Sequence, residues 1–163
     1  MTDDEDQRAY ASRRRIVFFD VENSNRLEHA QRMLSYLGLD RPGSTARIVA
    51  IGNWRVVSQQ TARLFARHGA ELVHSAPSAG VKDWSDMRIA AVVGLWLGTA
   101  RPGDVVEIVT DDQAFDAVGD VAANVGVAFR RCSHRRLVEE GFAARPRSSG
   151  RRRGRKVKRG GEQ

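Results

Sequence analysis

The chain has 163 residues, 41% of them hydrophobic, which suits one folded domain with a single core and is short for two. Its 27 Lys and Arg exceed its 20 Asp and Glu, and its single cysteine, Cys132, excludes an internal disulfide framework. The first residues are acidic and lack the apolar stretch of a signal peptide, and the most apolar segment, 89–97, is too short to span a bilayer. We therefore expect a soluble cytoplasmic protein that does not enter a membrane.

The positive charge is concentrated at the C-terminus. Residues 145–159 contain nine Arg and Lys, whereas residues 1–144 carry 18 basic and 19 acidic side chains. This distribution predicts a disordered acidic N-terminus over 1–12, a folded domain over 13–143 and a disordered basic tail over 144–163. A flexible basic tail suits contacts with the phosphates of a nucleic acid.

Apolar runs and helical stripes alternate along the predicted domain. A strand over 16–19, apolar throughout and suited to burial on both faces, ends at Asp20. A helix over about 26–37, a strand over 46–51, a helix over about 57–68 and a short strand over 71–74 follow. The next helix opens near Asp83 and runs to Leu97, with Asp86 on the same apolar stripe as Val93 and Leu97.

Residues 105–116 combine an apolar strand with three carboxylates. The strand should stop at Thr110, because Asp111 and Asp112 cannot enter a dry core unpaired. A helix is expected directly afterwards, with Phe115, Val118, Val121 and Ala122 on its apolar stripe. Asp112 and Asp116 are four residues apart, so a helical start would place them on the same side. A fifth strand over 126–129 and a short helix around 137–142 complete the pattern.

The alternation of strands and helices predicts an α/β fold with a parallel sheet and right-handed crossovers. Asp20 and Asp112 each follow a predicted strand. Open α/β sheets bind their ligands outside the carboxyl ends of the strands. These two acids are therefore expected at a ligand crevice.

Four short blocks resemble a known family. Residues 18–23, Phe-Phe-Asp-Val-Glu-Asn, resemble the opening D-x-E-N motif of NYN domains, and Gly-Asn-Trp-Arg at 52–55 resembles the segment after their second strand. Residues 82–86 resemble the K-x-x-x-D helix start, and 110–116 are similar to the S-x-D-x-x-F-D turn, with Ala114 where many members carry a second Asp. The blocks keep the family's order and spacing over about residues 15–131. The chain thus resembles the NYN domains, LabA-type members of the PIN-like metal-dependent ribonucleases.

This resemblance implies a Rossmann-like PIN fold, with a five-stranded parallel sheet in the order 3-2-1-4-5 and helices on both faces. It also implies Mg²⁺ or Mn²⁺ as the cofactor, since clustered carboxylates repel one another unless they are protonated or bridged by cations. The catalytic and metal-binding residues expected from it are Asp20, Asp86, Asp112 and Asp116. The expected substrate-binding residues are Asn23, Asn53, Arg55 and Lys82.

The predicted function is that of a divalent-metal-dependent (endo)ribonuclease that hydrolyses RNA phosphodiester bonds. The predicted partner is RNA, and a homodimer is compatible with the sequence. One alternative is a catalytically degenerate PIN-like module that binds RNA or a protein. A second alternative is a phospho-acceptor domain, which needs paired acids after the first strand and a Lys after the fifth. The paired acids here follow the fourth strand, and residues 130 and 131 are Arg.

Overall fold

The structure, a computed structural model, describes residues 13–23, 25–76, 81 and 83–143. The predicted acidic N-terminus, the predicted basic tail and Lys82 therefore lie outside the described residues. Five strands form one parallel sheet in the order β3-β2-β1-β4-β5, as predicted. They are β1 (Arg15–Asp20), β2 (Arg47–Gly52), β3 (Glu71–His74), β4 (Val105–Val109) and β5 (Ala128–Cys132).

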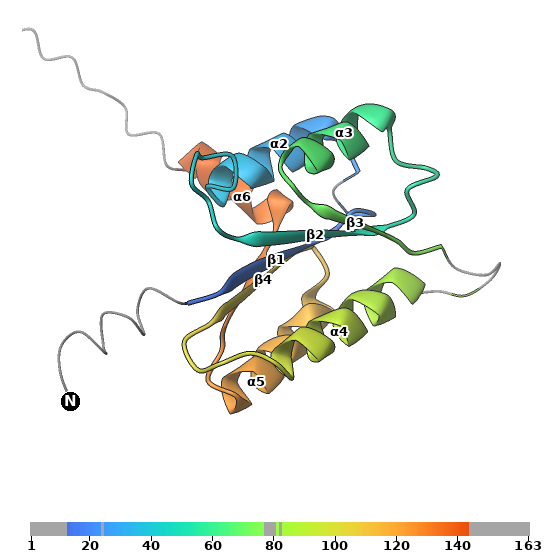
Figure 1. The fold of residues 1–163 in the computed structure, drawn as a ribbon. Helices are drawn as coiled ribbons and strands as arrows, with labels where there is room; N and C mark the ends of the chain where they lie inside the picture. Colours follow the sequence, from blue (N-terminus) through green and yellow to red (C-terminus); the bar gives the residue numbers. More distant parts are fainter. Residues whose placement is uncertain (1–12, 24, 77–80, 82, 144–163) are drawn as a thin grey trace, which may run out of the picture.

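Helices cover both faces of this sheet (Figure 1). One face carries α2 (Leu27–Tyr36), α3 (Gln59–Arg67) and α6 (His134–Ala143), and the other carries α4 (Trp84–Leu97) and α5 (Asp116–Asn124). A 3₁₀ turn, η1 (Gln113–Phe115), precedes α5. The predicted α/β architecture is confirmed. None of the described helices is long and apolar enough to cross a membrane.

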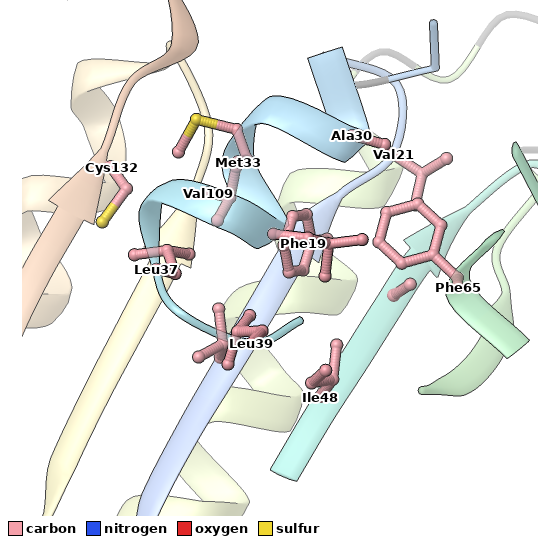
Figure 2. Packing of buried hydrophobic residues seen from close by; sticks show 13 residues of the cluster. Phe19, Val21, Ala30, Met33, Leu37, Leu39, Ile48, Phe65, Val109 and Cys132 are labelled. Atoms are coloured by element: carbon pink, nitrogen blue, oxygen red, sulfur yellow. The ribbon is translucent and has the colours of Figure 1, made fainter. Parts of the chain in front are cut away.

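The apolar run of β1 is buried on both faces because successive side chains of a strand point to opposite sides. Val17 and Phe19 belong to the cluster beneath α2 and α3, where the rings of Phe19 and Phe65 meet edge to face (Figure 2). Ile16 and Phe18 belong to the cluster beneath α4 and α5. The strand therefore anchors both halves of the core and holds Asp20 firmly at its end.

The fifth strand lies further along the chain than predicted. It covers Ala128–Cys132 instead of 126–129, and Gly126, with a φ of +72°, belongs to the turn before it. Two consecutive arginines fit because β5 is an edge strand whose side chains find acids nearby. Arg130 forms an ion pair with the buried Glu107 of β4, and Arg131 forms one with Asp116.

The last helix also begins earlier than predicted, at His134 instead of about residue 137. The hydroxyl of Ser133 accepts a hydrogen bond from the backbone N–H of Arg136 at 3.2 Å, which caps the first turn.

The apolar stripes of α4 and α5 are narrower than predicted. The residues of α4 that are buried are Ser85, Ile89, Val93 and Leu97, so Asp86 lies at the margin of the stripe instead of on it. Val121 of α5 was predicted to face the core, but its side chain is 53% exposed. The η1 turn advances three residues per turn, which rotates α5 relative to a helix that would start at Asp112.

Candidate active site

The candidate site lies at the carboxyl ends of the two central strands, β1 and β4. The chain leaves β1 toward β2 on one side of the sheet and leaves β4 toward β5 on the other, so this is the point where the strand order reverses. Such a reversal opens a crevice beyond the strand ends. The register pairs Phe19 with Val109, which places Asp20 beside Thr110.

Asp20 is the fully buried acid of this crevice. Its Oδ2 accepts hydrogen bonds from the hydroxyl of Thr110 at 2.9 Å and from the side-chain amide of Asn23. Its Oδ1 is buried and has no hydrogen-bond partner among the described residues. Burial raises the pKa of Asp20, and the charge of Glu22 acts in the same direction, against the lowering effect of hydrogen bonding by Asn23 and Thr110. One carboxylate oxygen is thus fixed by Thr110 and Asn23, while the other accepts no hydrogen bond from the described residues.

Thr110 connects the two strand ends and was missed by the sequence reasoning. Besides donating to Asp20, its Oγ1 accepts from Asn23 Nδ2 at 3.3 Å and from the backbone N–H of Asp112 at 3.2 Å. Its position after β4 was visible in the sequence, but its role depends on the β1–β4 pairing. Asn23 was predicted to bind substrate, but its side-chain amide donates a hydrogen bond to Asp20.

Asp86 lies close enough to Asp20 and to Asp112 to interact with both of them electrostatically. Burial, together with the negative charges of neighbouring acids that include Asp20 and Asp112, raises the pKa of Asp86 to about 6. Asp112 is oriented by the backbone N–H of Ala114, which donates to its Oδ1 at 2.8 Å. The structure therefore brings together three of the four acids that were predicted to form the site.

The fourth predicted acid, Asp116, is not brought to this cluster. Its carboxylate forms an ion pair with Arg131, with 2.7 Å between Arg131 Nε and Asp116 Oδ1. The expectation that Asp112 and Asp116 share one side of a helix was wrong, because Asp112 has an extended backbone and a 3₁₀ turn separates the two residues. Asp111 also turns away, since its Oδ1 accepts from Ser133 Oγ at 2.6 Å.

Two further acids, Glu22 and Asp83, lie near Asp86, and neither was predicted as a site residue. Glu22 accepts a hydrogen bond from the buried Ser85 of α4 at 2.7 Å, which ties the loop after β1 to the start of that helix. Asp83 occupies the N-cap position of α4 but has a φ of +57° and makes no side-chain capping bond. The charges of both acids contribute to the raised pKa of Asp86. The position of Glu22, two residues after Asp20, was the available sequence signal.

The remaining predicted substrate-binding residues follow β2. Asn53 forms a local turn, in which its Oδ1 accepts from the backbone N–H of Arg55 at 3.1 Å, and Arg55 itself is exposed. Gly52 is required here, because a Cβ on it would lie 2.9 Å from Val21 Cβ. The parallel pairing of β1 with β2 places the β2 end beside the β1 end, so Asn53 and Arg55 follow at the same edge of the sheet as Asp20.

The acids of this site can be compared with the ligand sets that divalent cations prefer. No group of three His, Cys, Asp or Glu side chains within the described part of the chain is arranged to hold a metal by itself. Mg²⁺, however, usually keeps several waters and binds through one or two carboxylates together with substrate phosphates. Two acids fit this sparse ligand set: Asp20, whose Oδ1 has no hydrogen-bond partner among the described residues, and Asp112, whose charge acts on Asp86 as that of Asp20 does.

The chain matches no protein-family model and no curated protein.

Proposed function

We propose that the protein is a divalent-metal-dependent ribonuclease that hydrolyses RNA phosphodiester bonds at the crevice between β1 and β4. The observation that carries the proposal is the group of acids there: Asp20 is fully buried with one oxygen that has no hydrogen-bond partner among the described residues, and burial together with the charge of Asp20 raises the pKa of Asp86. Perturbed acids in a cleft are typical of functional sites. RNA as the substrate rests on the similarity of four sequence blocks to NYN domains.

In this proposal Asp20 and Asp112 hold the metal directly, and Asp86 completes the site through water. When bound, Mg²⁺ or Mn²⁺ would supply Lewis-acid stabilisation of the phosphodiester and a lowered pKa for an attacking water. Without a cation the three carboxylates would repel the substrate's phosphate. Productive RNA binding at the crevice is therefore expected to depend on the metal.

The other residues of the site position these acids. Thr110 and Asn23 fix one oxygen of Asp20, and the N–H of Ala114 fixes Asp112. The Ser85–Glu22 hydrogen bond holds the first turn of α4 against the loop after β1, and Asp86 lies in that turn. Ligands held this way lose little freedom on binding, which favours a defined geometry at the reacting phosphate.

The proposal is tested with labelled single-stranded and structured RNAs incubated with Mn²⁺, Mg²⁺ or a chelator. Asp20→Asn and Asp112→Asn should each reduce cleavage by about a hundredfold or more, as expected when a metal ligand is lost. Asp116→Asn is the matched control, and it should retain most activity because Asp116 is engaged by Arg131. Circular dichroism would establish that each variant is folded. Cleavage that continues in chelator or in either of the first two variants would refute the proposal.

A binding module is the second candidate, and the lack of a three-ligand group among the described residues favours it. Such a module would bind the same RNAs with equal affinity in metal and in chelator, and it would cleave none of them.

A further inference from the structure

A groove of about 560 Å³ extends from the acid cluster between α4 and α5. The two helices lie side by side on one face of the sheet (Figure 1). Asp83, Asp86 and Asp112 line the groove near the amino ends of the helices. Apolar residues line the remainder, among them Met87, Ala90, Gly94, Leu97, Phe115 and Val121.

The charges of the lining residues determine which class of ligand the groove can bind. None of its described lining residues is Lys, Arg or His, so a phosphate inside it would have no cation to pair with. An uncharged, flat group with apolar faces would be accommodated, and N–H donors on its edge would find carboxylates at the acidic end. A nucleobase has these properties, and its volume is within the range of a pocket of this size.

Gly94 keeps the groove open. A glycine in a helix interior costs about 1 kcal/mol relative to alanine, and a closely packed neighbour commonly explains its presence. Here a Cβ on Gly94 would meet no atom within 4 Å, so packing does not require the glycine. The missing side chain leaves empty space in the wall of the groove instead.

The rim of the groove is apolar and faces water. Met87 on α4 is 72% exposed, and Val121 on α5 is 53% exposed. Both line the groove, one from each helix. Apolar side chains that flank a groove and are continuous with a polar site mark a surface that a ligand covers.

We infer that the groove is a base-binding subsite for single-stranded RNA and receives the nucleobase next to the phosphodiester held at Asp20 and Asp112. The inference rests on the proposed function and adds the class of substrate, RNA with an unpaired base at the cleavage position. A base in a duplex is stacked and paired, so it cannot enter a groove between two helices. The RNA backbone stays at the acidic end, where the metal would neutralise the carboxylates.

The test uses a leucine to fill the groove. Gly94→Leu places an isobutyl group in the open space, and the change should not harm folding because leucine is a better helix former than glycine. Ala91→Leu is the matched control, since residue 91 is an exposed position of the same helix that does not line the groove. The probe is a short single-stranded RNA with one 2-aminopurine, whose emission changes when the base leaves water. Titrations are done in Mg²⁺, on which productive RNA binding at the crevice is expected to depend. Gel analysis of each sample establishes that the probe is intact when its emission is read.

The wild-type protein and Ala91→Leu should change the emission of the probe equally. Gly94→Leu should abolish the change and weaken binding about tenfold or more, as expected when a pocket for an apolar group is blocked. An unaltered emission change in Gly94→Leu, or none in the wild-type protein, would overturn the inference and leave an apolar protein segment as the better occupant. Cleavage of RNA by the wild-type protein in Mn²⁺ is measured separately, so failure of the groove and failure of the nuclease proposal are distinguished.

Discussion

Replacing Asp86 by asparagine should stabilise the metal-free protein at neutral pH. Asp86 is only partly exposed, and burial together with the charges of Asp20 and Asp112 raises its pKa from 3.8 to about 6. An ionised Asp86 therefore destabilises the folded state relative to the unfolded chain. Asparagine keeps the approximate shape of the side chain and removes the charge.

The size of the effect follows from the shift in the pKa of Asp86. Each pKa unit corresponds to about 1.4 kcal/mol, so the shift gives an upper bound of roughly 3 kcal/mol. Because Asp86 is partly solvated, screening reduces this bound, and we expect about 1–2 kcal/mol. For a domain of this size the melting temperature should rise by roughly 4–8 °C.

The sign of the pH dependence is fixed by the raised pKa. Between about pH 4 and pH 6 the folded protein holds a proton on Asp86 that the unfolded chain has released, so wild-type stability falls as the pH rises through this window. The gain in the free energy of unfolding of Asp86→Asn over wild type should therefore be complete above about pH 7 and disappear near pH 4.

The assay is urea unfolding of both proteins in chelator across this pH range, with Asp120→Asn as the control. Asp120 is an exposed acid of α5 that does not line the groove, so its replacement removes the same charge from a site away from the cluster. A variant Asp86→Asn that is less stable than wild type at neutral pH, or equally stabilised at both ends of the range, would refute this account of the cluster.

Two further predictions concern the metal and the tail. Millimolar Mn²⁺ should raise the melting temperature of the wild-type protein, since a ligand at a hundredfold excess over its Kd stabilises the folded state by about 2.7 kcal/mol, and Asp112→Asn should remove most of that increase. If the melting curve does not move, the acids do not bind the ion. Deleting residues 145–163 should leave the circular dichroism spectrum of the folded domain unchanged and give a shallower dependence of RNA affinity on salt, because each lost phosphate contact on a single strand contributes about 0.7 to the slope. Equal slopes for the full-length and shortened chains would mean that the nine cations do not contact RNA.

The sequence by itself determined the features that depend on local pattern. An apolar run such as 16–19 has to be buried on both faces, and the change to a carboxylate marks Asp20 as the end of the strand, although the structure buries this carboxylate as well. The same reasoning located Asp112 after β4. Such strand ends depend on the local sequence. The structure ends β1 at Asp20, as predicted, and ends β4 at Val109, one residue before the predicted Thr110.

Only the tertiary structure decided which of these side chains meet. Thr110 reaches Asp20 because β1 and β4 are neighbours in the sheet, and Ser85 reaches Glu22 across 63 positions of the chain. Asp116 does not join the acid cluster, because Arg131 of β5 forms an ion pair with it, with 2.7 Å between Arg131 Nε and Asp116 Oδ1. Contacts of this kind depend on strand order, on strand register and on the rotation of a helix. A shift of one residue in the register of a strand moves each of its side chains to the opposite face of the sheet, although the sequence of the strand is unchanged. The local pattern of the sequence does not encode them, since hydrophobic periodicity specifies that a face is buried without specifying which partner covers it.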